Sequence, residues 1–331
     1  MDSTRRKTLQ GIGAAAAIGG TAAALAAATR PARAQAWPAK PPHAIVGFPA
    51  GGVVDVMARA VTDRMGTELG QPVVVEARPG AGANIAVEAV LAAPRDGYTW
   101  LVSSNFLFVN PAMDPAVKWK YDDFVPVVRY ALSPSFFLVP GDAPFATLAD
   151  WVAHARRNPG VQYGNGGVGT TQSMSMAMLM RTAGVRLDPV YYKGAPQMMQ
   201  DIVGGQLSCG LIPSTVAIPV VRSGRAKALA TSGERRSPAL PSVPTFTEAG
   251  YPAATALSWY GLHVAAGTPP DVVRRMARAA QAACGLAEVQ SRLTGAGGEE
   301  AFLEPERFAA YVNEESKRWL PLLAGEKKPG G

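Results

Sequence analysis

The stretch HAIVGFPAGGVVDVMARAVTDRMGTEL, residues 43–69, decides the fold class. Residues 43–48 are apolar enough for a buried strand, and 49–52 form a proline- and glycine-rich turn. Gly70 stands where a helix commonly ends, because glycine tolerates the left-handed conformation. Between turn and glycine, one helix face carries apolar residues at helical spacing, namely Ala58, Val61, Met65 and Leu69. A strand, a turn and a helix in this order predict the first unit of an α/β sheet.

The rest of the chain repeats this alternation of strand and helix, and a second α/β unit begins near Thr147. Because strands and helices alternate, we expect a parallel or mostly parallel sheet in each unit. Hinge strands are expected near Val139 and Trp259. Further strands are predicted at 72–76, 97–103, 136–139, 161–164, 190–192, 207–212, 226–231 and 259–265. Helices are predicted at 148–157, 172–182, 196–203, 270–294 and 305–323.

Residues 1–34 have the pattern of an export signal rather than of a folded element. Arg5-Arg6 lies in a twin-arginine motif, and residues 11–28 are almost all alanine, glycine, isoleucine or leucine. Small residues then precede a cleavage site after Ala34. A membrane anchor is the alternative, but alanine and glycine transfer weakly into lipid and basic residues follow the run. We expect a periplasmic protein whose twin-arginine signal peptide is removed.

The mature chain is large enough for two domains and carries little net charge. Its 297 residues hold 27 basic and 24 acidic side chains, so the net charge falls from +7 to +3. No basic run or arginine and aromatic stripe remains to bind nucleic acid. Cys209 and Cys284 do not make a disulfide framework, and we expect both thiols to be free and packed as small apolar groups.

The loop from Pro49 to Asp55 lies between a predicted strand and a helix N-terminus. Glycine at Gly51 and Gly52 lets several backbone N–H groups face an anion, and the helix dipole favours negative charge there. Asp55 in the first helical turn also fits a capping role. The loop is therefore a candidate anion site.

A second glycine-rich loop, Gly164–Gly169, again follows a strand and precedes a helix. It matches the G-x-G-x-x-G pattern of dinucleotide-binding folds, with Asp188 about twenty residues on. However, a ribose-binding acid belongs at the end of the next strand, where Lys193-Gly194 stands instead. The glycine pattern nevertheless leaves a periplasmic dinucleotide-binding oxidoreductase as the alternative function.

Other chemistry has little support in the sequence. His43, His154 and His263 are isolated from each other and from cysteine, so no metal site is expected. No G-x-S-x-G nucleophile motif occurs. Methionines alternate from Met174 to Met180, and core or lobe-interface packing explains them better than a metal site does. We expect no catalytic residue, no metal and no cofactor.

Taken in order, the motifs resemble the Bug-type receptors, the extracytoplasmic substrate-binding proteins of tripartite tricarboxylate transporters. The resemblance spans the mature chain. It rests on the segments 46–55, 70–76, 78–84, 96–99, 110–111, 123–124, 158–160, 163–164, 169–170, 192–194, 204–206, 240–245, 248–250 and 267–269.

The resemblance implies a type II periplasmic-binding-protein fold, a two-lobed α/β "Venus flytrap" with hinge strands. The first lobe would comprise residues 35–140 and 256–331, and the second residues 141–255. In such receptors, facing loops of the two lobes hold one carboxylate of the ligand with bridging waters. Carried over, the ligand-binding residues are Phe48, Ala50, Gly51, Gly52, Asp55, Asn105, Gly167, Gly169, Thr170, Thr171, Gln172, Tyr192, Lys193 and Gly194.

Three positions depart from the family pattern. Ser173 replaces a frequent histidine, and Ser208 replaces a usual aspartate. Ile212-Pro213 replaces a polar or acidic pair that points at the distal part of the ligand. The ammonium group of an amino-acid ligand needs a carboxylate partner. The apolar Ile212 therefore favours an aromatic or short-chain carboxylic acid over an amino acid. Ile212 could equally belong to the core.

The sequence therefore predicts a periplasmic solute-binding receptor without enzymatic activity. Its expected partners are a small carboxylate and either membrane transporter subunits or a sensor protein. We expect a monomer that binds no nucleic acid.

Overall fold

The predicted strand–turn–helix unit forms at the start of the described chain. β1 (His43–Val46) leads through the turn into α2 (Val53–Leu69), which ends at Gly70 with a left-handed φ of 73°. The structure is a computed structural model, and it describes residues 37–323 apart from Val168 and Lys193. The predicted signal peptide lies outside these residues. None of the described helices is long and apolar enough to cross a membrane.

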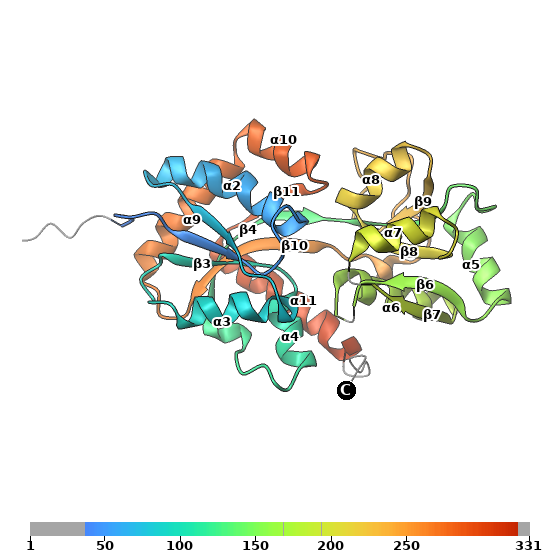
Figure 1. Cartoon of the computed structure of the whole chain (residues 1–331), viewed down its shortest axis with the longest axis horizontal. Coiled ribbons are helices and arrows are strands. Elements are labelled where there is room, and N and C mark those ends of the chain that lie inside the picture. The colour runs from blue at the N-terminus through green and yellow to red at the C-terminus, as the bar shows by residue number, and fades with distance from the viewer. Residues whose placement is uncertain (1–36, 168, 193, 324–331) are drawn as a thin grey trace, which may run out of the picture. The chain divides into compact units, whose positions relative to one another are not determined.

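A six-stranded mixed sheet organises what we call the first lobe (Figure 1). β1 lies parallel to both of its neighbours, whereas β10 runs antiparallel to β3 and β4. The strand order is β11-β4-β10-β3-β1-β2. The new strands are β2 (Val74–Ala77), β3 (Thr99–Ser103), β4 (Phe124–Ser133), β10 (Ser258–Ala265) and β11 (Glu299–Leu303).

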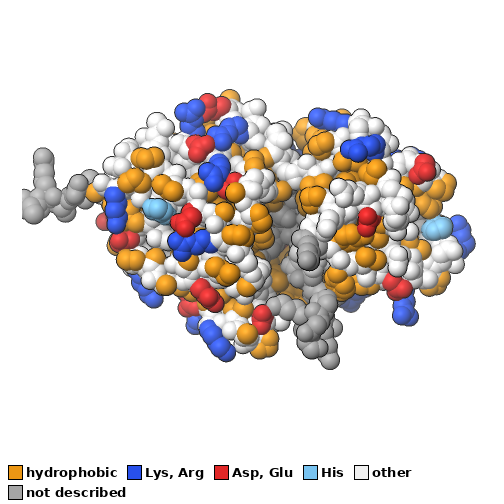
Figure 2. All heavy atoms as spheres, in the orientation of Figure 1, with side chains coloured by type: hydrophobic (Ala, Val, Ile, Leu, Met, Phe, Trp, Pro, Cys, Tyr) orange, Lys and Arg blue, Asp and Glu red, His pale blue; other side chains and the backbone are white. Residues whose placement is uncertain are grey.

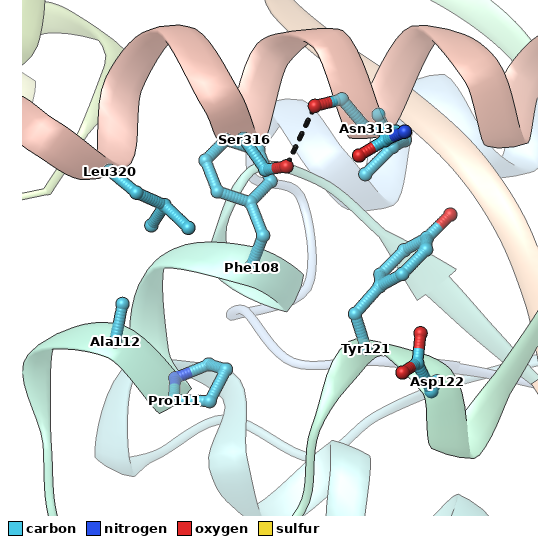
Figure 3. Close-up of a pocket in the computed structure, with 9 residues that line it drawn as sticks. Phe108, Pro111, Ala112, Tyr121, Asp122, Asn313, Ser316 and Leu320 are labelled. Atoms are coloured by element: carbon cyan, nitrogen blue, oxygen red, sulfur yellow. Dashed lines mark hydrogen bonds between the residues drawn. The ribbon is translucent and has the colours of Figure 1, made fainter.

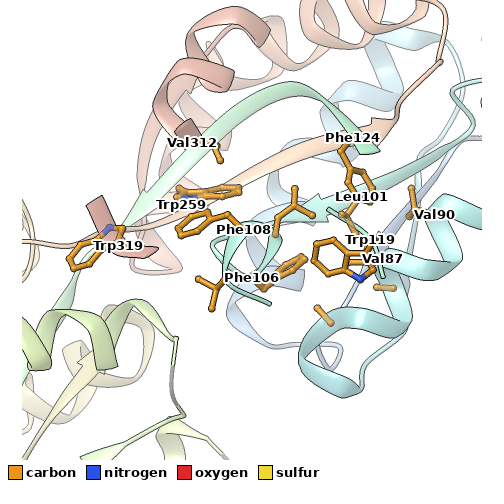
Figure 4. Packing of buried hydrophobic residues seen from close by; sticks show 14 of the residues in the cluster. Val87, Val90, Leu101, Phe106, Phe108, Trp119, Phe124, Trp259, Val312 and Trp319 are labelled. Atoms are coloured by element: carbon orange, nitrogen blue, oxygen red, sulfur yellow. The ribbon is translucent and has the colours of Figure 1, made fainter. Parts of the chain in front are cut away.

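Three helices and the first sheet enclose an aromatic-rich core (Figure 4). They are α3 (Asn84–Ala92), α4 (Phe106–Met113) and α11 (Pro305–Leu323). Trp259 and Trp319 are fully buried in it. α9 (Pro270–Cys284) and α10 (Ala287–Gly295) instead contact α2. Short 3-10 turns, η1 (Ala81–Ala83) and η2 (Tyr121–Asp123), complete the lobe.

A five-stranded sheet, ordered β7-β6-β8-β5-β9, organises the second lobe. β6 is parallel to β7 and β8, while β5 is antiparallel to β8 and β9. Its strands are β5 (Ser135–Pro140), β6 (Val161–Asn165), β7 (Leu187–Tyr191), β8 (Cys209–Pro213) and β9 (Ala226–Thr231). Its helices are α5 (Leu148–Arg157), α6 (Thr171–Ala183), α7 (Ala195–Val203) and α8 (Ser214–Arg222), with η3 at Pro252–Ala254.

Both faces of the second sheet are covered, because neighbouring residues of a strand point to opposite faces. Phe137 and Val139 pack in a cluster with α5 and α6. Phe136 and Leu138, which alternate with them in sequence, pack in a cluster with α7 and α8. The near-continuous apolar run of β5 is what a strand buried on both faces requires.

The chain crosses between the sheets at Pro134, the one residue separating β4 from β5. The hinge was expected near Val139 and Trp259, but both residues lie inside sheets. The crossings fall at Pro134 and in the segment 232–257. A sheet-based boundary between the lobes would therefore stand at 134 rather than at 140.

Sequence periodicity missed or merged several elements. The helix expected at 270–294 is two helices, because Leu286 adopts an extended conformation after Gly285. α4, α8 and β4 were not predicted, and each contains a proline, which weakens the pattern of a regular element. β11 was also missed, since two of its five residues are glutamates.

The two cysteines are free and buried, as expected. Cys209 belongs to β8 in the second lobe and Cys284 ends α9 in the first. Burial raises the pKa of both thiols, that of Cys284 to about 12, so neither is a reactive thiolate.

Candidate functional site

Helix N-termini gather at one edge of each sheet. The parallel strands β1, β2 and β3 lead into α2, η1 with α3, and α4, so these elements start at the same edge. β6, β7 and β8 likewise lead into α6, α7 and α8 (Figure 1). Ligands of open α/β sheets bind at such carboxyl edges, and helix N-termini favour anions. Both predicted loops lie there.

The first loop is closed by its own hydrogen bonds. Gly51, at φ 76°, donates its N–H to Asp55 Oδ2 at 3.0 Å, and Gly52 donates to the carbonyl of Pro49 at 3.1 Å. In this arrangement neither N–H group is available to an anion. The two glycines let the turn form, while Ala50 is exposed at its tip.

Asp55 is committed to the protein itself. The residue is 3% exposed, and its carboxylate accepts two hydrogen bonds from Arg59, at 3.0 Å each. Burial alone would raise the pKa of Asp55, but the bonds from Arg59 and Gly51 outweigh it and hold the pKa below its ordinary value. The capping interpretation therefore fits Asp55 better than ligand contact. Arg59, four residues on, was missed, although its spacing is that of a helical ion pair.

Asn105 is buried with an unused donor. It follows β3 and is 4% exposed. Its Oδ1 accepts from Ser104 Oγ at 3.3 Å and from the backbone N–H of Trp259 at 3.5 Å. Its Nδ2 makes no hydrogen bond with any described residue. A buried amide without a partner is costly, so this nitrogen is suited to an acceptor brought by a ligand. Nearby Phe48 is half-buried, its ring 5.9 Å from that of Phe106.

The second loop is organised as a helix cap. Thr170 Oγ1 accepts from the N–H of Ser173 at 3.1 Å and donates to the carbonyl of Gly167 at 2.9 Å. The N–H of Gly167 donates to Asn165 Oδ1 at 2.9 Å. Thr171 is buried at the start of α6. Asn165 was not predicted, and it fixes the loop from the end of β6.

Gly169 touches the opposite lobe. It has a φ of 82°, and a Cβ atom there would stand 2.4 Å from Val109 Cγ1 on α4. The carboxyl edges of the two sheets are therefore adjacent at this point. Gln172, three residues on, donates its Nε2 to Ser135 Oγ at 2.8 Å, beside the crossing at Pro134. Two predicted ligand residues thus also connect the second lobe's loop to α4 and to the hinge.

The third predicted segment, 192–194, is only partly described. Tyr192 donates its hydroxyl to Asp201 Oδ2 on α7 at 2.6 Å, which leaves that hydroxyl no role toward a ligand in this arrangement. Lys193 lies outside the described residues. Gly194 precedes α7 at the carboxyl edge.

Ile212 and Asp188 lie away from the carboxyl edge or inside the core. Ile212 is fully buried in the α7–α8 core cluster, so the ligand preference inferred from it loses its basis. Asp188 precedes the strand predicted at 190–192, but in the structure that strand begins earlier and Asp188 is the second residue of β7. It pairs with Gln162, at the end of the strand opposite to the glycine loop. That geometry disfavours a dinucleotide, and Gly164 instead makes room for Met198 and Leu207.

The methionines of α6 serve packing, as predicted. Met176 lies in a second-lobe cluster, while Met174 joins the first-lobe core. Met178 packs against both clusters. Within the described residues there is no group of three possible metal ligands from histidine, cysteine, aspartate and glutamate.

One buried pair has the residue types of a nucleophile and a base. His263 Nδ1 lies 2.7 Å from Ser103 Oγ, and its Nε2 lies 3.3 Å from the hydroxyl of Tyr121. Both His263 and Ser103 are fully buried. Burial lowers the pKa of His263 to about 3, so the ring stays neutral and serves as a structural bridge.

A groove of about 560 Å³ lies on the first lobe between α4, η2 and α11 (Figure 3). Of the predicted site residues that the structure describes, none lines it. Among the described residues that line it, most are apolar and Asp122 is the one charged side chain. A carboxylate would be repelled there, which favours the helix N-termini as the ligand site. Figure 2 shows a hollow between the two lobes, where the carboxyl edges approach each other.

Comparison with known proteins identifies close relatives. The model of the tripartite tricarboxylate transporter family receptor, TctC, matches residues 57–327. The chain is 30% identical to protein BugT of Bordetella pertussis over 93% of its own length and 95% of BugT. It is 28% identical to Rpa4515 of R. palustris, solved with adipate, at a TM-score of 0.79 over 87% of this chain and 98% of that one. MatC from Rhodopseudomonas palustris, solved with bound malate, is 29% identical, with a TM-score of 0.75 over 87% and 100% of the two chains.

Proposed function

Because the chain belongs to the tripartite tricarboxylate transporter receptor family, we propose that it is a periplasmic receptor for a small carboxylic acid. It delivers this ligand to transporter subunits or to a sensor protein and does no chemistry on it. The relatives solved with adipate and malate support a carboxylate. We further infer a monomer with a twin-arginine signal peptide cleaved after Ala34.

The observation that carries the proposal is the buried Asn105 at the carboxyl edge of the first sheet. Its unbonded Nδ2 offers a hydrogen-bond donor at the start of α4, on the sheet edge where α2 and α3 also begin. The ligand then lies between this edge and the edge that carries Gly167–Gln172 and Gly194. Phe48, Ala50 and the N-terminal turns of α2 and α6 complete the site, and Asp55, Gly51 and Tyr192 hold it in shape.

The ligand is an aromatic or short-chain acid rather than an amino acid. An ammonium group needs a carboxylate partner. Asp55 is the acid among the predicted site residues, and its carboxylate is already occupied by Arg59 and Gly51. Ile212, buried in the core, takes no part in this preference. Half-buried Phe48 supplies an apolar surface for the ligand's carbon skeleton.

The test is a melting-temperature screen of the purified protein with adipate, malate, benzoate, alanine, glutamate and NAD. Ligand at a hundred times its Kd stabilises by about 2.7 kcal/mol, a shift of a few degrees. We expect a shift with at least one acid that lacks an ammonium group. A shift with an amino acid alone would overturn the ligand class. A shift with NAD alone would favour the oxidoreductase alternative.

The site itself is tested with Asn105→Asp, which keeps the size of the side chain and adds a negative charge. We expect at least about a tenfold loss of acid affinity by calorimetry, since like charges in a partly buried site repel strongly. Asn313→Asp, in the first-lobe groove, is the control and should leave affinity unchanged. The opposite pattern would move the site to that groove.

A further inference from the structure

Met174 buries its side chain in the lobe to which it does not belong. α6 starts at the carboxyl edge of the second sheet, and its residues Met176, Leu179 and Ala183 join the second lobe's cluster. Met174 is 2% exposed, yet it belongs to the first lobe's cluster, together with Val109 and Trp319. A side chain in that position is buried only while the lobes are in contact.

Further contacts accompany Met174. Gly169 brings its backbone against Val109, which is 3% exposed. Met178, one turn beyond Met174, packs against both clusters. On the other side, α11 contacts α6 and contributes Trp319 and Leu323. We call this set the lobe seam: Val109, Trp319 and Leu323 of the first lobe, with Gly169, Met174 and Met178 of the second.

Polar contacts flank the seam at the end of α11. Arg318 donates Nη2 to the carbonyl of Thr255 at 2.6 Å and to that of Ala253 at 3.3 Å. Ala254, between them, is buried in the second lobe's cluster, and its carbonyl accepts from Ser175 Oγ on α6 at 2.5 Å. The last turns of α11 therefore hold the second lobe through both apolar and polar groups.

From these contacts we infer that the lobe seam stabilises the closed receptor independently of any ligand, and that Met174 sets affinity without touching the ligand. Removing apolar side chains from water is favourable whatever occupies the cleft. The unliganded protein therefore populates the closed state, and a ligand selects it. The apparent Kd equals the intrinsic Kd divided by the closed fraction. The expected effect of the seam on ligand affinity rests on the proposed receptor function. Its expected effect on the distance between the lobes does not.

A pair of alanine variants on α6 tests whether the lobe seam keeps the two lobes together in the unliganded protein. Met174→Ala and Met176→Ala remove the same atoms from positions that are 2% and 1% exposed, so both should lower the Tm by several degrees. Of these two methionines, only Met174 belongs to the lobe seam. Spin labels on Glu68→Cys in α2 and Arg157→Cys in α5, both exposed, report the distance between the lobes without ligand.

We expect Met174→Ala to lengthen or broaden the distance distribution and Met176→Ala to match the parent protein. Val109→Ala, in the first lobe, should reproduce the effect and serves in place of Met174→Ala if that variant does not fold. Equal distances in the parent, Met174→Ala and Val109→Ala would overturn the inference, whatever the protein binds.

The effect on binding provides the second readout. Because a smaller closed fraction reduces every apparent affinity by one factor, Met174→Ala should weaken all bound acids equally, by about tenfold for a tenfold smaller closed fraction. Their ranking should not change. A loss that differs between acids would show that Met174 contacts the ligand and would overturn the assignment. If no acid binds even the parent protein, the proposed function fails while the distance measurement still decides the seam.

Discussion

The two glycine loops share the same order of strand, glycine and helix in the sequence but have different surroundings. Each follows a parallel strand, precedes a helix and contains a glycine in the left-handed region, Gly51 at φ 76° and Gly169 at φ 82°. A Cβ atom on Gly51 would meet no atom of the described residues within 4 Å, whereas one on Gly169 would stand 2.4 Å from Val109. The first glycine is required by the conformation of its turn, and the second also by the approach of the other lobe.

The largest expected effect separates these two reasons. Gly51→Ala and Gly169→Ala both add a side chain to a left-handed residue, which costs about 1–2 kcal/mol. Only Gly169→Ala also forces α4 and the loop apart. Because only Gly169→Ala opposes the approach of the lobes, we expect at least about a hundredfold loss of acid affinity for it, each 1.4 kcal/mol of lost interlobe contact being worth about tenfold. For Gly51→Ala, whose backbone strain is present with and without ligand, we expect a loss of no more than about tenfold by calorimetry.

Gly184→Ala supplies the control for this comparison. Gly184 ends α6 at φ 62° with open space around it, so it carries the conformational cost without the interlobe contact. The acid affinity of this variant should match that of the parent protein. If Gly51→Ala and Gly169→Ala lose equal affinity, the contact with Val109 has no part in binding.

A smaller effect is expected at Asp55, which anchors the first loop. Asp55→Asn weakens charge-assisted hydrogen bonds to Arg59 and Gly51, and we expect a loss of about 2 kcal/mol in the free energy of unfolding. The native pKa of Asp55 lies below its unfolded value, so its stabilisation is present above about pH 4 and disappears as the pH falls through the native pKa. The Tm difference between parent and variant should therefore shrink below about pH 4. A constant difference at all pH values would contradict the assigned ion pair.

The smallest effect is expected at Tyr192. Tyr192→Phe removes a hydroxyl that bonds to Asp201, which should cost about 1 kcal/mol of unfolding free energy. Acid affinity, measured by calorimetry, should stay within about twofold, because that hydroxyl points to α7. Tyr191→Phe is the matched control, since it changes an exposed neighbour and should alter neither quantity. A tenfold loss of affinity in Tyr192→Phe would restore this side chain to the ligand site.

The sequence predicts the positions of the two loops well because local pattern determines them. Strand, glycine and helix follow one another within a dozen residues, so α2, α5 and α11 end or begin where periodicity and capping place them. The family resemblance adds the receptor class, which the TctC match confirms.

What each loop residue does could not be predicted, because long-range neighbours decide it. From sequence, Ile212 and Gly169 are both candidates for the ligand site. In the structure, Ile212 is buried in the core with α7 and α8, whereas Gly169 lies against Val109 of the opposite lobe. The same holds for Asn105, whose role depends on the backbone of Trp259, 154 positions away. Asp55 and Arg59 are the exception, since a pair four residues apart on a helix can be found from spacing alone.

The crossing at Pro134 also bears on how the chain acquires its structure during synthesis. The second sheet is built from the continuous segment 135–231, so all its strands have emerged once Thr231 has left the ribosome. The first sheet begins earlier but lacks β10, which must insert between β3 and β4. Until then β3 and β4 present open edges, the kind of surface that recruits other chains. The nascent protein is therefore exposed to aggregation through β3 and β4 until β10 has been made, whereas β1, β2 and β3 can already pair with one another.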